Sequence, residues 1–191
     1  MRAIHLEKSQ LRMKWPSASR RHCPLVNPPA QYAARTCRIG DVQGFLTLMS
    51  YLDFDPWDEA KLAYNMNRII PEGWFFATDS SHQIVATAMC QHNYSGRSPF
   101  TGDLGWVACH PDHRGQGLGR CLCASATRRF LEAGYSAIQL RTEYYRLPAI
   151  KTYLSLGYVP SIASPETLVL WESVCAKLSW PLTPEAWNAQ A

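Results

Sequence analysis

Several features that assign a chain to a common class are missing from these 191 residues. No apolar run approaches the roughly 20 residues that a transmembrane helix needs, so we expect no membrane-spanning segment. The seven cysteines form neither a C-x-x-C pair nor a Cys/His zinc pattern, and their number is odd. We therefore expect free thiols in a reducing cytoplasm, without disulfides and without a bound metal.

Two familiar phosphate-binding motifs are absent as well. The dinucleotide fingerprint G-x-G-x-x-G and the nucleotide loop G-x-x-x-x-G-K-[ST] find no match in the chain. Gly115, Gly117 and Gly119 give G-x-G-x-G instead, and no Gly-Lys pair follows them. The sequence therefore predicts neither a Rossmann dinucleotide site nor a P-loop.

Positive charge is concentrated near the N-terminus. Residues 1–38 hold eight Lys or Arg against one acidic residue, although the net charge of the whole chain is only +4. The first 31 residues show no sustained period, and four prolines interrupt them. We expect a basic, poorly ordered tail over 1–31, a folded domain over 32–180 and a C-terminal tail over 181–191. The basic tail could touch nucleic acid, but a solvated extension fits the pattern better.

Hydrophobic periodicity beyond residue 31 predicts alternating strands and helices. The predicted strands lie near 32–38, 74–78, 83–91, 103–109, 137–142, 158–159 and 167–170. The predicted helices lie near 42–49, 58–70, 117–133 and 148–156, with a further one at 171–178. This order indicates an α/β protein with one mixed sheet and helices on both faces.

The stretch from Leu104 to Arg120 has the features of an anion site. It begins as a short apolar strand, breaks at His110-Pro111-Asp112-His113, and passes through three alternating glycines into a helical pattern. Glycines let the backbone approach a ligand closely, and the N–H groups and dipole at a helix start favour phosphate oxygens. A tight strand-to-helix turn without a ligand is the alternative interpretation.

Two blocks of sequence resemble the motifs of one family. Arg114 to Gly119 fits [Q/R]-x-x-G-x-[G/A] and resembles the acyl-CoA pyrophosphate loop of the GNAT (GCN5-related) N-acetyltransferase superfamily. Ala149 to Tyr158 resembles its A-x-x-x-Y-x-x-x-G-[F/Y] helix and following strand, and begins 35 residues beyond Arg114. The order of strands and helices is also similar. The resemblance implies a GNAT-like acyl-CoA N-acyltransferase fold and an acetyl-CoA-dependent N-acetyltransferase.

On this resemblance, acetyl-CoA is the co-substrate and the glycine turn holds its pyrophosphate. Arg114 and Arg120 either add positive charge there or are solvated helix-end residues. The pantetheine arm would pair with the central strand as an added strand does. One backbone N–H, at Ala108 or Cys109, would face the thioester oxygen. The implied cofactor-binding residues are Val107, Ala108, Cys109, Arg114, Gly115, Gln116, Gly117, Leu118, Gly119 and Arg120.

The resemblance also suggests the catalytic residues. Tyr153 matches the tyrosine that the family places to protonate the CoA thiolate, and a phenol with a pKa near ~10 is protonated at neutral pH. Asp103 lies at the offset where several members carry a glutamate that deprotonates the amine, often through water. His92 and Glu143 are rival bases. As alternatives, Tyr153 is a core residue of an amphipathic helix and Asp103 is a polar residue at a strand entry.

Two positions bear on the mechanism. Where the family commonly has Asn three residues before the alanine, this chain has Arg146. This change puts one side-chain contact to the cofactor in doubt, although Arg146 could instead reach a CoA phosphate. Cys109 could suggest an acyl-enzyme, but the sequence shows no His/Asp pattern that would activate the thiol. We therefore expect direct attack by the amine.

The acceptor is expected to be a primary amine of a small molecule or peptide. It would bind near the first two helices and the loops at 92–102 and 142–147. A GNAT-fold module that binds CoA as a sensor or docking domain, without turnover, is the alternative function. We expect a monomer or homodimer that engages neither membrane nor nucleic acid. Aromatic candidates for the acceptor pocket are Phe54, Trp57, Tyr94, Tyr144 and Tyr145.

Overall fold

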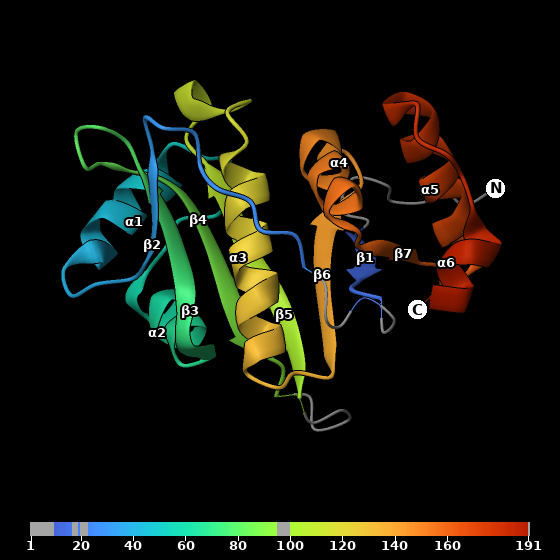
Figure 1. Cartoon of the computed structure of the whole chain (residues 1–191), viewed down its shortest axis with the longest axis horizontal. Coiled ribbons are helices and arrows are strands. Elements are labelled where there is room, and N and C mark those ends of the chain that lie inside the picture. The colour runs from blue at the N-terminus through green and yellow to red at the C-terminus, as the bar shows by residue number, and fades with distance from the viewer. Residues whose placement is uncertain (1–9, 17–18, 20–22, 95–99, 191) are drawn as a thin grey trace.

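A seven-stranded mixed sheet organises the structure (Figure 1), a computed structural model that describes residues 10–16, 19, 23–94 and 100–190. The strand order is β2-β3-β4-β5-β6-β1-β7, with β5 and β6 parallel and the other neighbours antiparallel. The strands are β1 (Gln10–Lys14), β2 (Ala33–Thr36), β3 (Ile69–Thr78), β4 (Ile84–His92), β5 (Thr101–Cys109), β6 (Ala137–Glu143) and β7 (Val159–Ser161). The helices are α1 (Asp41–Ser50), α2 (Glu59–Met66), α3 (Leu118–Glu132), α4 (Leu147–Leu156), α5 (Pro165–Leu178) and α6 (Pro184–Gln190).

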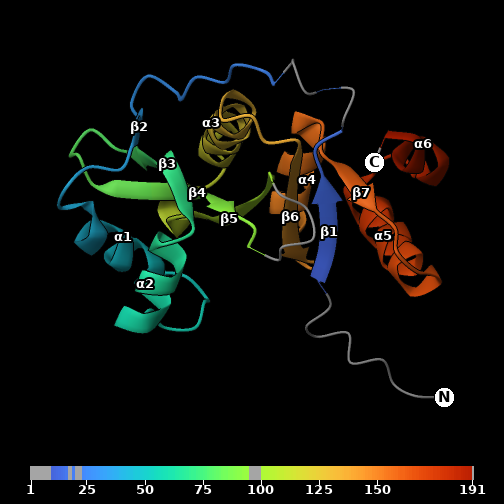
Figure 2. The same cartoon turned by 90° about the horizontal axis from the view of Figure 1, so that it is seen from below.

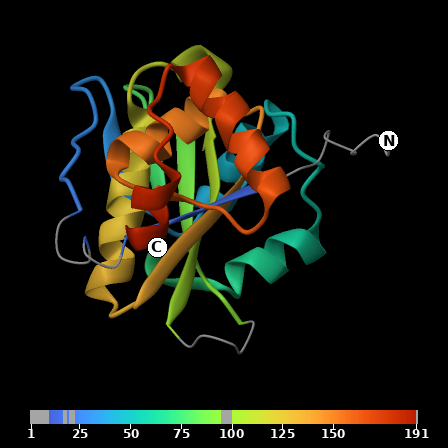
Figure 3. The ribbon, with the colours of Figure 1, turned by 90° about the vertical axis from the view of Figure 1, so that its right-hand side faces the viewer.

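Helices lie on both faces of the sheet, which confirms the fold class expected from the sequence. Helices α1 and α2 lie on one face, and α3 and α4 lie on the other (Figure 2). Helices α5 and α6 stand at the β7 end of the sheet (Figure 3). Leu122 and Phe130 of α3 are fully buried in the larger core, while Phe45 of α1 packs with its ring centroid 5.0 Å from that of Trp74. Within the described residues, no helix is long and apolar enough to cross a membrane.

The N-terminal segment differs most from the expectation. Residues 10–14 do not belong to a poorly ordered tail but form β1, an inner strand between β6 and β7. Leu11 and Met13 are fully buried while Arg12 between them is exposed, which is the alternation of a half-buried strand. The expectation for residues 1–9 falls outside the described residues.

The sequence carried a signal for β1. Leu11, Met13 and Trp15 alternate with two basic residues, and all three apolar side chains are buried. The Trp15 N–H continues the pairing by donating to the Ile138 carbonyl at 2.8 Å. The alternating run is short, and Pro16 follows it directly. The basic, proline-rich composition around it therefore led to the prediction of a tail instead of a strand.

Two expectations near the C-terminus are also corrected. The strand expected at 167–170 is wrong, because these residues lie inside α5. The Ser164 hydroxyl caps that helix by accepting from the Thr167 N–H at 3.3 Å, and Pro165 suits its first turn. The tail expected at 181–191 contains α6, whose Trp187 is 5% exposed.

The second helix is shorter than expected. Its N-cap is Asp58 as predicted, with the carboxylate accepting from the Lys61 N–H at 2.7 Å. It ends at Met66, and Ile69 already begins β3, so the apolar pair Ile69–Ile70 belongs to the sheet rather than to the helix face.

We predict that Leu11→Ala lowers the free energy of unfolding by about 2–5 kcal/mol, because it truncates a fully buried side chain in an inner strand. Arg12→Gln, on the exposed side of the same strand, is the matched control and should change the free energy by no more than about 0.5 kcal/mol. Urea unfolding followed by circular dichroism measures both. Equally small effects would show that β1 contributes nothing to the cooperative core.

Candidate active site

Strands β5 and β6 separate part-way along the sheet. Their pairing runs from Thr101↔Ala137 to Leu104↔Leu140, yet β5 continues to Cys109. Within the described residues, the last part of β5 pairs with β4 on one side and has no strand on its other side. An extended ligand can add to such an open edge through main-chain hydrogen bonds.

A bulge in β5 explains the separation. Between paired positions, β4 advances from Thr87 to Met89 while β5 advances from Gly105 to Ala108, so β5 carries one extra residue. Trp106 lies in this bulge with φ of 50°, a left-handed conformation that is uncommon for a large side chain. Because a bulge bends and twists its strand, β5 turns away from β6 at this point.

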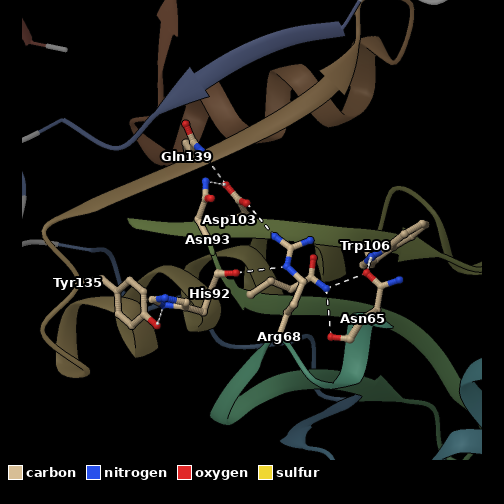
Figure 4. A network of polar contacts seen from close by, with 9 residues as sticks. Asn65, Arg68, His92, Asn93, Asp103, Trp106, Tyr135 and Gln139 are labelled. Atoms are coloured by element: carbon tan, nitrogen blue, oxygen red, sulfur yellow. Dashed lines mark hydrogen bonds and ion pairs between the residues drawn. The ribbon is translucent and has the colours of Figure 1, made fainter. Parts of the chain in front are cut away.

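The bulge is held by a buried polar contact between three elements. The Asn65 side-chain oxygen, from α2, accepts from the Trp106 indole N–H at 2.6 Å and from the Gln91 amide at 2.8 Å. Asn65 and Gln91 are each 4% exposed. Figure 4 shows Asn65 and Trp106 facing one another beside β5. The contact offsets the cost of the left-handed residue and fixes the direction of the strand beyond it.

The glycine turn lies at the end of the open strand. Gly115 and Gly117 have φ of 76° and 78°, in the left-handed region that favours glycine. A methyl group added at either of them, or at Gly119, would meet no other atom within 4 Å. No side chain caps α3, and its first turn carries no acidic residue. The turn is therefore open above its backbone and suits an anion such as a diphosphate.

Two arginines flank this turn. Arg114 is exposed, and its Nε donates to the Cys109 carbonyl at 3.4 Å, so its base is anchored at the end of β5. Arg120 is exposed on the first turn of α3. Both add positive charge near the helix N-terminus, where the helix dipole has the same sign. The glycine turn and the two arginines together suit the binding of a pyrophosphate group.

Cys109 does not have the properties of a nucleophile. Burial raises the pKa of its thiol to about 11, and the nearby Arg114 offsets only part of that effect. The thiol is therefore protonated near neutral pH, whereas the nucleophilic form is the thiolate.

Tyr153 of α4 lies in the larger core and is 5% exposed. Burial raises the pKa of its hydroxyl well above the usual value of 10, and nearby Cys123 adds to this effect. No described residue forms a hydrogen bond to this hydroxyl, whereas the neighbouring Tyr158 hydroxyl bonds with that of Thr127 at 2.7 Å. Tyr153 is thus a protonated phenol with an uncommitted proton.

We call the separation of β5 and β6 beyond Leu104↔Leu140 the fork. A polar cavity of about 610 Å³ lies between α2 and the sheet, where the fork begins. Its lining residues are Gln10, Lys61, Tyr64, Asn65, Arg68, Gln91, Asn93, Asp103, Leu104, Gly105, Trp106 and Arg141. A second cavity of about 570 Å³ adjoins it and shares Tyr64, Arg68 and Asn93. Of the expected aromatic residues, Tyr94 lines this second cavity. Phe54 and Trp57 pack against Trp106, at 5.9 and 4.5 Å between ring centroids.

Asp103 is the one carboxylate among the residues that line this cavity. Its Oδ2 forms an ion pair with Arg68 Nη2 at 3.0 Å, and its Oδ1 accepts from the Gln139 amide at 2.8 Å (Figure 4). Asn93 contributes a longer contact of 3.5 Å to Oδ1. The carboxylate is thereby fixed in position at the paired end of the fork.

The rival bases lie outside the cavity lining. The His92 ring nitrogen Nδ1 is 2.7 Å from the Tyr135 hydroxyl. Glu143 Oε2 forms an ion pair with Arg146 Nε at 2.7 Å. The Arg146 guanidinium also lies over the Phe54 ring, 4.5 Å from its centroid, and so joins the β6–α4 connection to the α1–α2 connection. Among the described residues, no group of three His, Cys, Asp or Glu is placed to hold a metal ion.

Sequence reasoning missed much of the cavity lining. Arg68 and Gln91 lie in parts of the chain where the sequence shows only a helix end and a strand. Asn65 gave no signal either, since an asparagine on an amphipathic helix is expected on its solvent side. These residues line one cavity because α2 packs against β4 and β5. A local sequence pattern does not predict that packing.

Comparisons with known proteins show the family of this chain. Residues 42–158 match the Acetyltransferase (GNAT) family. Mycothiol acetyltransferase of Arthrobacter sp. (strain FB24) is 29% identical over 89 residues, 46% of this chain and 28% of that protein. Its Nocardia farcinica counterpart is 30% identical over 92 residues, 48% of this chain and 30% of that protein. These matches therefore span less than a third of either curated relative.

A solved structure supports the fold. A GCN5-related N-acetyltransferase from Sphaerobacter thermophilus superposes with a TM-score of 0.66 at 19% identity, covering 80% of this chain and 48% of that chain. At this identity the likeness shows a shared fold.

Proposed function

This chain belongs to the Acetyltransferase (GNAT) family, and on that basis we propose that it moves an acetyl group from acetyl-CoA to a primary amine of a small molecule or peptide. The observation that carries the proposal is the fork between β5 and β6, with an open glycine turn at its wide end and a polar cavity at its closed end. The wide end suits a donor with a diphosphate, and the cavity suits a polar acceptor.

On the donor side, the open edge of β5 and the glycine turn would bind acetyl-CoA. The backbone of Val107, Ala108 and Cys109 would pair with the pantetheine arm, and one N–H there would stabilise negative charge on the thioester oxygen. The backbone from Gly115 to Arg120, with Gln116 and Leu118 inside it, would hold the pyrophosphate. Bound in this way, acetyl-CoA supplies an activated acyl carbon at the fork.

On the acceptor side, Asp103 would remove the proton that the amine must lose, directly or through one water. Its position in the cavity wall supports this role, and the bonds from Arg68 and Gln139 hold it in one orientation. An ionised carboxylate has about four acceptor sites, so these bonds leave room for the amine or a bridging water.

Tyr153 would donate the proton that the departing thiolate needs. Its raised pKa keeps the proton in place across the working range, and no described group competes for it. With Cys109 held as a thiol, an acyl-enzyme has no support, so the amine would attack the thioester directly. The alternative of a CoA-binding module without turnover does not account for this uncommitted phenol.

The first test is transfer itself, with acetyl-CoA, a panel of amines and the Tyr153→Phe variant. We expect intersecting lines in initial-rate plots, as direct attack requires, and a kcat about 10²-fold lower in the variant with the Kd for CoA unchanged. Tyr158→Phe is the matched control, since it removes a structural hydroxyl and should cost about 1 kcal/mol of stability without lowering kcat. Parallel lines would contradict direct attack, and an unchanged kcat in Tyr153→Phe would remove its role.

A second prediction separates binding from folding at the glycine turn. Gly119→Ala places a methyl group over the first turn of α3, and should raise the Kd for CoA about tenfold through lost contacts to a charged group. The melting temperature should not fall, since alanine is the better helix former. Gly134→Ala, at a left-handed position beyond the other end of α3, should do the reverse, with a lower melting temperature and unchanged CoA affinity. Calorimetric titration with CoA and thermal unfolding measure the two effects, and normal affinity in Gly119→Ala would argue against a diphosphate there.

A third prediction concerns the base. Asp103→Asn keeps the shape of the side chain, and its oxygen can still accept from Gln139, but it cannot take a proton. We expect kcat to fall about 10²-fold in steady-state assays, with the KM for acetyl-CoA unchanged. Glu143→Gln, which removes a rival carboxylate, should keep kcat within about twofold of the wild type. A large loss in Glu143→Gln and none in Asp103→Asn would move the role to Glu143.

A further inference from the structure

Two arginines lie side by side at the fork. Arg141 is the first residue of β6 after its last paired position, Leu140↔Leu104, and it lines the 610 Å³ cavity. Arg12 of β1 is directly opposite Arg141 in the antiparallel register. Both side chains are exposed, and neither has a hydrogen bond or ion pair within the described residues.

This arrangement is unfavourable on its own. Like charges directly opposite each other on one face of a sheet destabilise the pairing of β1 with β6. An anion between the two guanidinium groups would remove the repulsion. Planar guanidinium groups bind carboxylate and phosphate through paired hydrogen bonds, so two of them make a strong anion site.

The other charged residues that line the cavity are already engaged. Arg68 is paired with Asp103, as described above, and Glu143 is paired with Arg146. The Lys61 ammonium donates to the Asp55 carbonyl at 2.6 Å and lies 5.0 Å from the centroid of the Trp57 ring, which holds it at the α1–α2 connection. Among the described residues that line the cavity, Arg141 is therefore the charged side chain without a partner, and Arg12 and Lys14 extend the positive charge along the same face of β1.

The position of Arg141 relates this charge to the reaction. On β5, the residue at the level of Arg141 is Gly105, which also lines the cavity. Because glycine has no side chain, nothing from this position of β5 comes between Arg141 and the cavity. Asp103 is paired with Gln139, two residues before Arg141, and alternate residues of a strand share one face. The Gln139 amide donates to Asp103, so Arg141, two residues further along β6, lies on the same face of the sheet as the proposed base.

We propose that Arg141 and Arg12 bind an anionic group, a carboxylate or a phosphate, carried by the acceptor amine itself. The inference rests on the proposed function and specifies its substrate class. The acceptor presents its amine towards Asp103 and the fork, while its anion lies a few bonds away between the two guanidinium groups. Neutral and polycationic amines are poor acceptors, because they leave the arginine pair unneutralised.

The kinetic test uses short amines that differ in their charge. O-phosphoethanolamine and β-alanine carry a phosphate and a carboxylate, and propylamine carries neither. Wild-type kcat/KM should be at least about tenfold higher for one of the anionic amines, and Arg141→Gln and Arg12→Gln should each remove most of that preference through KM. The KM for acetyl-CoA should not change. Arg38→Gln, at an exposed position before α1, is the matched control and should keep the preference.

A binding test without acetyl-CoA keeps this inference separate from the proposed function. Each of the three amines, and inorganic phosphate, is titrated against wild type, Arg141→Gln and Arg12→Gln, and the shift in melting temperature is recorded. Anionic amines should stabilise the wild type and not the two variants. The phosphate and carboxylate arms identify which anion the arginines prefer.

Several outcomes would overturn the inference. Equal use of propylamine and the anionic amines would do so while leaving acetyl transfer intact. A raised KM for acetyl-CoA in Arg141→Gln would assign the arginine to the donor instead. If no amine is acetylated, the proposed function fails, and the thermal shifts still decide whether the arginine pair binds an anion.

Discussion

The hydrogen bond between Asn65 and the Trp106 indole holds the bulge in β5, where this strand and β6 separate. An extra residue in β5 makes the strand bend, but a bend alone does not fix where the strand goes. Asn65 comes from α2, so the contact fixes the helix, the bulge and the end of β5 relative to each other. The open edge that follows exposes main-chain groups that a sheet normally pairs, and such groups require a partner. On the proposed function, the backbone of β5 would itself be the binding surface at the fork.

The two ends of the fork depend on different kinds of residue. At the wide end, glycines and an uncapped helix start leave backbone N–H groups accessible, because no side chain covers them. At the closed end, side chains from α2, β4, β5, β6 and β1 converge on one cavity. On the proposed function, donor binding would depend on local conformation, and acceptor binding would depend on packing between distant segments.

The same division determines what could be predicted from the sequence. The glycine turn and Tyr153 could be predicted as positions because each is defined by a contiguous motif, although their roles stay predictions. The order of most strands and helices along the chain followed from hydrophobic periodicity, whereas the order of strands within the sheet did not. Arg68 and Gln91 could not be found, because their role depends on how α2 packs across the sheet. The strand at β1 was missed because its partners, β6 and β7, lie more than a hundred residues away, so nothing local distinguishes five alternating residues from a tail.

The position of β1 has a consequence for biosynthesis. Gln10 hydrogen-bonds with Glu143 across a separation of 133 residues, and β7 follows later still. During translation β1 leaves the ribosome well before either partner strand exists. Its apolar residues Leu11 and Met13 then have no sheet to join, and they stay accessible to chaperones or to unrelated strand edges until β6 and β7 emerge. Completion of the sheet is thus a late event, and the wall of the 610 Å³ cavity, which includes Gln10 of β1 and Arg141 of β6, forms only when β1 has joined β6.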